Sequence, residues 1–227
     1  MPFNKHALLS LSAAGVLAFG VSACGSDSSD GSSASSSDTA AATPQPTPAA
    51  EVTDLSKGVD TEVTLDAGFV KALGTLKLTP APTGKAEITK AGVAKFPITG
   101  GNVKYYTPGT VSPYVQGEID HDGSGLSLTG GSTKVTLTNF KIDPGASVLT
   151  GQVSVNGKVA AASAPLFFLD GRTLKPLATG PNNTAILEGT TVKLKQEAAD
   201  LLNQTFKTDA LKAGLVIGVA KITVKTA

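Results

Sequence analysis

Short runs of alternating apolar and polar residues, separated by turn residues, recur from Val59 to the C-terminal end of this chain. Residues 133–142 show the alternation most clearly, and Asn156-Gly157 is a pair that typically turns one antiparallel strand into the next. Alternation places successive side chains on opposite faces of a strand, so that one face can be buried while the other meets water. The chain is therefore predicted to be mainly β.

Two segments have helical spacing instead. Asp66 can cap a short helix over residues 67–73, which Gly74 would end. Residues 196–207 carry four apolar residues on one helical face, namely Ala198, Leu201, Leu202 and Phe206. Because these helices flank a series of hairpins, we expect an antiparallel β-sandwich with two short helices at its edges.

Three further segments have distinct patterns. Residues 75–79 alternate and are expected to form a strand, followed by a turn over residues 80–84. The segment Asp122-Gly123-Ser124-Gly125 has the composition of a tight hairpin turn. Residues 164–169 are apolar throughout, which indicates a strand buried on both faces.

The N-terminal segment has the layout of a secretory signal: Lys5 precedes an apolar or small stretch over residues 7–21 that is short for a membrane span. Val21-Ser22-Ala23-Cys24 resembles the bacterial lipobox, in which the peptide is cut before the cysteine and the thiol carries a diacylglycerol. Cys24 is the only cysteine, so no disulfide within the chain accounts for it. The resemblance implies a lipoprotein held at the extracytoplasmic face of the cell membrane. An ordinary signal cleaved near Ala23 is the alternative.

Residues 25–50 contain no aromatic and no large aliphatic residue. Such a segment cannot bury enough apolar surface to offset its chain entropy, so we expect a disordered spacer. The predicted organisation is a signal peptide over residues 1–23, a lipidated Cys24 with a Ser- and Pro-rich tether over residues 24–52, and a β-sandwich domain over residues 53–227.

Charge and composition argue against two classes of function. The chain has 19 Lys and Arg against 18 Asp and Glu, which gives no electrostatic reason to bind nucleic acid. No G-x-S-x-G motif occurs, and only His121 of the mature chain could pair with a nucleophile, so an enzyme is not expected. Glu118 and Asp120 share one face of a predicted strand, as in a glycosidase, but an exposed sheet face explains them equally well.

The candidate ligand-binding residues are His121 and the three tyrosines, Tyr105, Tyr106 and Tyr114. His121 is either a ligand contact that responds to pH or a solvated turn residue. Tyrosine gives a large contact area at low entropy cost, so the loop between Tyr106 and Tyr114 is a candidate recognition patch. Tyrosine also simply suits the ends of strands.

Oxygen-bearing side chains at alternate positions, Asp120, Asp122 and Ser124, have the spacing of the first half of a calcium loop. Gly131 stands where the bidentate glutamate of such a loop belongs. The sequence therefore offers only a partial calcium candidate and predicts no metal site.

Two stretches resemble the HtaA domain of actinobacterial haem-uptake proteins. Residues 117–123 together with Leu126 match the central hairpin of that family. Residues 194–206, followed by Ala213-Gly214, match its late helix. The resemblance implies a β domain that binds haem through a tyrosine on the first helix, a histidine on the hairpin that hydrogen-bonds it, and a second tyrosine on the late helix.

The matching positions of this chain hold Ala72, His121 and Phe206. Neither alanine nor phenylalanine can supply the phenolate that holds ferric iron, so no cofactor is expected by the family's route. The neighbours Asp120 and Asp122 are expected to favour the protonated imidazolium of His121, which cannot coordinate a metal.

Three hypotheses about function follow from these features. The first is a membrane-anchored lipoprotein that presents a β-sandwich binding module to a small ligand or an envelope partner, with the membrane itself contacted through the lipid. The second is haem binding and uptake in the HtaA manner. The third is a purely structural envelope protein.

Overall fold

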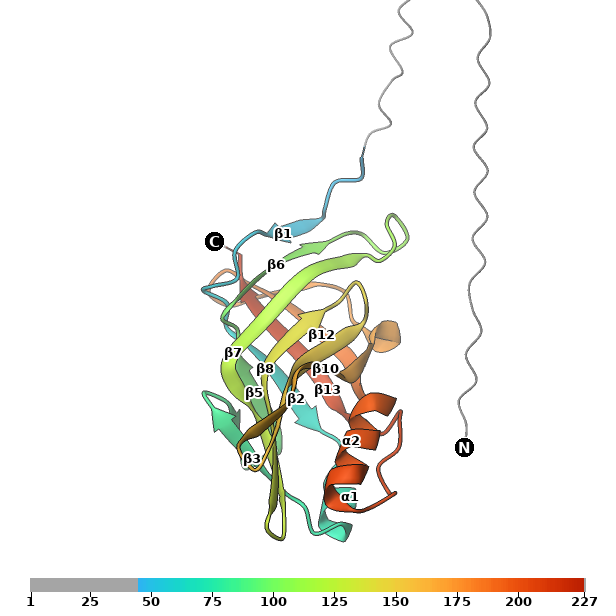
Figure 1. The fold of residues 1–227 in the computed structure, drawn as a ribbon. Coiled ribbons are helices and arrows are strands. Elements are labelled where there is room, and N and C mark those ends of the chain that lie inside the picture. The colour runs from blue at the N-terminus through green and yellow to red at the C-terminus, as the bar shows by residue number, and fades with distance from the viewer. Residues whose placement is uncertain (1–44, 227) are drawn as a thin grey trace, which may run out of the picture. The chain divides into compact units, whose positions relative to one another are not determined.

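The computed structural model describes residues 45–226, so Cys24, the predicted signal peptide and most of the predicted tether lie outside the described residues. Within the described part, thirteen strands form one antiparallel sheet that curls on itself, with two α-helices at one end (Figure 1). The predicted mainly-β class is confirmed. Neither helix has the length and apolar character that a membrane crossing requires, among the residues described.

The elements follow in chain order. The first half contains β1 (Ala50–Val52), β2 (Asp60–Leu65), α1 (Ala67–Thr75), β3 (Thr79–Gly84), β4 (Glu87–Ile88), β5 (Val93–Pro97), β6 (Gly100–Tyr105) and β7 (Val115–Gly130). The second half contains β8 (Thr133–Asp143), β9 (Val148–Val155), β10 (Lys158–Asp170), the 3-10 turn η1 (Gly171–Thr173), β11 (Ala178–Gly180), β12 (Thr184–Leu194), α2 (Gln196–Phe206) and β13 (Val216–Lys225).

The strand order explains why the sheet curls. Neighbours run β1-β6-β7-β8-β9-β10-β12-β13-β2-β5-β4, while β3 pairs with β7 and β11 with β12. β5 and β6 lie near opposite ends of this order, yet only Ile98 and Thr99 join them in the chain. Thr99 donates from its backbone N–H to the carbonyl of Asp120 on β7 at 2.8 Å, which ties the two ends together. The predicted sandwich of two sheets is thus replaced by one curled sheet, whose two sides face each other.

Two glycines permit the tight pairing of β6 and β7. Gly101 and Gly117 have φ values of +107° and +114°. A Cβ atom on Gly101 would lie 2.0 Å from the carbonyl oxygen of Glu118, and one on Gly117 would lie 2.2 Å from that of Asn102. Any side chain at either position would therefore force the strands apart and strain the backbone.

The long strand β7 replaces the hairpin turn that was predicted at Asp122–Gly125. His121 pairs with Phe140 and Gly125 with Thr138, so three residues of β7 face Asn139 alone. The prediction was wrong because a glycine-rich segment also suits a β-bulge, where an extra residue bends a strand without ending it. The bulge changes which residues face inward: Ile119 and His121 are buried before it, and Ser124 and Leu128 after it.

One further strand prediction was wrong, and another holds only in part. α1 continues to Thr75, and the next strand is β3, which contains Pro80 and Pro82 where a turn was expected. β3 is an edge strand that pairs only with β7. An edge strand tolerates proline because the backbone groups on its unpaired side have no partner strand to bond. In β10, the neighbours Leu166 and Phe167 are both buried, at 1% and 8% exposure, whereas Phe168 is 44% exposed, so the predicted burial on both faces is interrupted at Phe168.

Both helices form where the sequence indicates, although α1 runs past Gly74, the expected end, to Thr75. The Asp66 side chain accepts a hydrogen bond from the backbone N–H of Phe69 at 3.1 Å and caps α1. α2 buries Ala198 and Leu202, and it ends where Lys207 adopts a left-handed conformation with φ +56°. Figure 1 shows both helices at one end of the domain and β1 with β6 at the other.

β1 lies within the segment that was predicted as tether. It pairs with β6 through Ala50–Tyr105 and Val52–Val103, and Leu55 just after it is 1% exposed. The folded region therefore begins at Ala50, slightly before the expected boundary at residue 53. Three residues without strong periodicity give no strand signal in sequence, and only pairing with β6 makes them a strand.

Candidate ligand-binding cavity

The concave side of the curled sheet encloses a cavity of about 1030 Å³. Its lining is mostly apolar and comes from strands far apart in the sequence, including Val63, Ile119, Phe140, Ile142, Val192 and Ile217. Residues of β1, of the loop before β7 and of η1 complete the wall. No residue of α1 or α2 is part of it. The volume is at the upper end of the range that holds small ligands.

His121 lies on the inner wall of this cavity and is 1% exposed. Its Nε2 shares a 2.8 Å hydrogen bond with Thr61 Oγ1 of β2, and its ring meets Phe96 edge to face at 6.4 Å. Nδ1 is buried and has no hydrogen-bond partner. Burial lowers the pKa of His121 to about 4, against a weaker opposing effect of the Phe140 backbone, so the imidazole is neutral near pH 7.

Two expectations about His121 were therefore wrong. It is not a solvated turn residue, because it occupies an inward position of β7 just before the bulge. It is also not held protonated by Asp120 and Asp122, since alternation along the strand turns these neighbours to the opposite face. A buried ring loses more from desolvation than it gains from carboxylates that remain in water.

The tyrosines separate into two environments. Tyr105 and Tyr114 both line the cavity, and their rings meet edge to face with centroids 5.9 Å apart. Tyr106 does not line it; it is buried at 9% exposure, and its backbone N–H donates to the carbonyl of Tyr114 at 2.7 Å. The fold thus brings His121, Tyr105 and Tyr114 to one cavity and leaves Tyr106 outside. Ligand binding by any of them stays a prediction.

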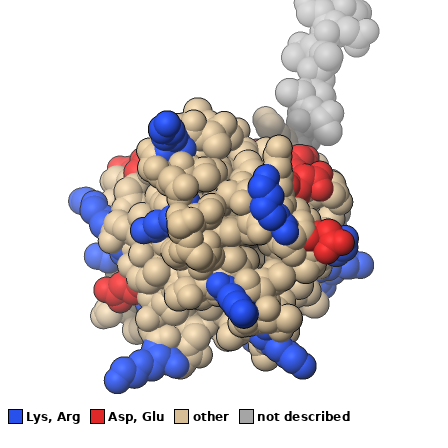
Figure 2. Space-filling view, turned by 60° about the horizontal axis from the view of Figure 1, so that its bottom comes forward, with Lys and Arg blue, Asp and Glu red and all other residues tan. Residues whose placement is uncertain are grey.

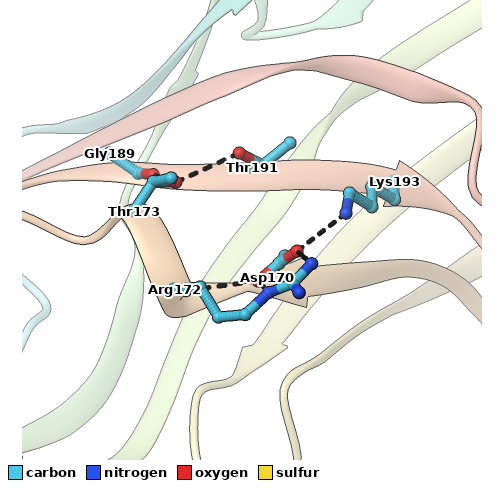
Figure 3. A network of polar contacts seen from close by, with 6 residues as sticks. All are labelled: Asp170, Arg172, Thr173, Gly189, Thr191 and Lys193. Carbon is cyan, nitrogen blue, oxygen red and sulfur yellow. Dashed lines mark hydrogen bonds and ion pairs between the residues drawn. The ribbon is translucent and has the colours of Figure 1, made fainter.

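An ionic cluster borders the cavity where β10 passes into η1 (Figure 3). Asp170 accepts two hydrogen bonds from the Arg172 guanidinium, at 2.9 Å from Nε and 2.6 Å from Nη2. Lys193 of β12 donates to the same carboxylate at 2.7 Å. Arg172 and then Lys193 hold the pKa of Asp170 well below its usual range, so the carboxylate stays ionised.

The hydroxyl of Thr173 links η1 to β12. The Thr173 hydroxyl donates to the carbonyl of Gly189 at 2.6 Å and lies 3.3 Å from the hydroxyl of Thr191 (Figure 3). The residues of this rim were not identified from the sequence. Asp170-Gly171 was predicted only as a turn. An Asp two residues before an Arg is a common pair, so it gives no sequence signal for an ionic cluster at the edge of a cavity.

The partial calcium candidate is not assembled. Asp120 lies 3.5 Å from the ammonium of Lys141, which also pairs with Glu118 at 2.7 Å. Ser124 is fully buried on the other face, where its hydroxyl donates to the carbonyl of His121 at 3.1 Å. No group of three or more His, Cys, Asp or Glu side chains suited to a metal occurs among residues 45–226.

The haem positions implied by the resemblance are on the helices, away from the cavity. Ala72 lies on α1 and Phe206 on α2. Phe206 and Leu78 both approach Gly130 closely enough that a Cβ there would lie 3.3 Å and 2.6 Å from them. These apolar groups supply no ligand for iron, and His121 is bonded to Thr61 instead. The residues present do not fit haem ligation by the family's route.

Charges on the surface are dispersed on the face seen in Figure 2. Lys and Arg side chains stand apart from one another there, over a mostly uncharged surface. This face has no continuous basic stripe of the kind that a nucleic-acid partner needs. The expectation that no nucleic acid binds stays a prediction.

No protein-family model matches this chain, and no curated protein matches it. Among solved structures, the C-terminal domain of HtaA from Corynebacterium glutamicum is similar, with a TM-score of 0.50 and 14% sequence identity over 77% of this chain and 97% of that one. A domain-swapped dimer of a variant of the same domain is similar with a TM-score of 0.43 and 15% identity, over 70% and 91% of the two chains. The first likeness shows that the fold is of the HtaA type, and it shows the fold alone.

Proposed function

We propose that this domain binds an apolar small molecule in the cavity of its curled sheet, at the extracytoplasmic face of a membrane. The cavity is the observation that supports this most strongly. Protein interiors are packed as densely as organic crystals and contain few voids larger than a water molecule. An apolar space of about 1030 Å³ is far beyond such packing defects, and water gains few hydrogen bonds there.

The location rests on the N-terminal sequence. Cys24 would carry the diacylglycerol that holds the chain at the membrane, and residues 25–49 would separate the folded domain from the bilayer. A module in this position meets molecules that leave or enter the envelope. An apolar ligand dissolves poorly in water, which gives a carrier at the membrane surface a physical purpose.

The test is to purify the exported chain from the membranes of its native host and to identify non-covalently bound ligands by native mass spectrometry and organic extraction. We expect a co-purified apolar molecule of small-molecule mass. Ala220→Phe should displace it, because Ala220 lines the cavity and is 5% exposed. Ala160→Phe, on an exposed position of β10, is the matched control and should retain the ligand. Equal loss in both variants, or an empty wild type, would favour a purely structural role.

Haem binding in the HtaA manner is the second candidate, and the likeness in fold is what favours it. Against it stand Ala72 and Phe206 at the positions where the resemblance implies tyrosines. A hemin titration followed in the Soret region distinguishes the two. A sharp one-to-one transition in the wild type would make haem the ligand.

A further inference from the structure

We infer that the ligand of this cavity is an anionic amphiphile, whose apolar body lies inside the sheet and whose carboxylate or phosphate head binds Arg172. This inference rests on the proposed function and narrows it to one class of molecule. It depends on the charged residues of the lining, which are few and unevenly placed.

The described lining contains three residues of the Asp, Glu, Lys and Arg types: Glu51, Asp170 and Arg172. Both carboxylates already have cationic partners. Glu51 pairs with Lys104 at 3.2 Å, and Asp170 binds Lys193 as well as Arg172. Two cations thus share the single carboxylate of Asp170, and the cluster at this part of the rim has a net positive charge.

Arg172 is the member of this cluster that can accept a second anion. Its two bonds to Asp170 use two of the five N–H donors of the guanidinium. Its side chain is 82% exposed, whereas that of Lys193 is 23% exposed. Asp170 fixes the guanidinium in one orientation, which reduces the entropy that binding a head group would cost. An arginine held in this way suits a planar carboxylate or a phosphate.

The rest of the lining is suited to the other end of such a molecule. The inner wall contains aliphatic and aromatic side chains, and the imidazole of His121 on it is neutral near pH 7 and bonded to Thr61. A head group placed deep in the cavity would leave its charge without a partner, which is costly in an apolar site. The ligand therefore binds with its apolar body inside the cavity and its charged head group at the rim, next to Arg172.

The inference is tested with three probes of equal chain length: palmitate, hexadecyl phosphate and hexadecanol. Each is titrated below its aggregation limit into the acyl-free chain from Gly25 onward, with Kd measured by calorimetry at low salt. We expect both anions to bind roughly three- to ten-fold more tightly than the neutral alcohol, as for one partly exposed charge contact. The difference should shrink at high salt because the contact is partly exposed.

Arg172→Gln should remove the preference for the anions while leaving hexadecanol binding unchanged. Arg172→Lys should keep part of the preference for the anions, because lysine retains the positive charge but lacks the planar guanidinium that can bind an anion through two N–H groups. Lys175→Gln is the matched control: Lys175 pairs with Glu188 at 2.9 Å and does not line the cavity, so the preference should persist. Thermal unfolding of each variant checks that the fold is intact.

The outcomes separate the two proposals. Equal affinity for all three probes in the wild type, or a preference that survives Arg172→Gln, would overturn the role of Arg172 while leaving an apolar-ligand cavity in place. Failure of all three probes to bind, together with an empty cavity in the chain purified from its host, would overturn both.

Discussion

His121 and Thr61 are 60 residues apart in sequence, yet His121 Nε2 lies 2.8 Å from Thr61 Oγ1 and links β7 to β2 across the inside of the curled sheet. The two strands are not neighbours in the sheet, so this bond joins its two sides. Both residues are buried, at 1% and 4% exposure, and they bond within an apolar wall.

Thr61→Val should destabilise the domain by about 1–2 kcal/mol, because it leaves the imidazole of His121 buried with no partner on either nitrogen. Thr61→Val combined with His121→Phe should recover part of this loss, since both polar groups are then gone. Chemical denaturation of the wild type, both single variants and the double variant measures the coupling. Strictly additive effects would contradict a direct bond between the two side chains.

The stability of the domain should fall as the pH drops from about 6.5 toward 4. The pKa of His121 is about 4 in the folded state and about 6.5 when unfolded, so below pH 6.5 the unfolded state binds a proton that the folded state excludes. The loss should approach roughly 2–3 kcal/mol near pH 4.5. Urea denaturation at pH 7 and pH 4.5 measures it. His121→Phe should remove this part of the pH dependence. If the stability of that variant falls with pH as steeply as that of the wild type, the titrating groups are carboxylates and not His121.

A chain beginning at residue 45 should fold by itself, because the described core lies entirely within residues 45–226. Its circular dichroism should be mainly β with a small helical part. A chain beginning at Thr53 lacks β1 and should be less stable by about 1–2 kcal/mol, from the lost pairing with β6 and the lost packing of Val52. Equal denaturation midpoints for the two chains would mean that β1 adds nothing to stability.

Replacing Cys24 by Ser should leave an unlipidated precursor and abolish labelling by radioactive palmitate at this position. The reason is chemical, since only the thiol can receive the diacylglycerol in the lipobox reaction. Ser22→Thr, which retains the cysteine, serves as the control. Palmitate labelling of the Cys24→Ser chain at the wild-type level would show that the anchor lies elsewhere.

Wild-type protein should show only weak association with hemin, without a one-to-one Soret transition. Ala72→Tyr should raise the affinity at least several-fold if α1 corresponds to the tyrosine-bearing helix of the HtaA resemblance, since it restores a phenolate at that position. Val70→Tyr is a control on the same helix, at a residue that is 49% exposed. No gain from Ala72→Tyr would count against this alignment of the helix.

The sequence predicted the structural features that depend only on residues close together in the chain. The cap at Asp66, the turn at Asn156-Gly157 and the helix from Gln196 each rest on local backbone preferences and side-chain spacing. The mainly-β class follows from the same alternation, which any strand in this sheet needs for one buried face.

What the tertiary structure alone decided is where those local pieces meet. His121 is inward because the β7 bulge comes just after it, and a shift of one residue would have turned it to solvent. The cavity exists because the sheet closes on itself through the short link between β5 and β6, which brings together residues from β2, β7, β10 and β13. Arg172 borders the cavity only because β10 ends at its rim. Such placements depend on strand order and register, which arise from pairing between distant segments and therefore leave no local pattern in the sequence.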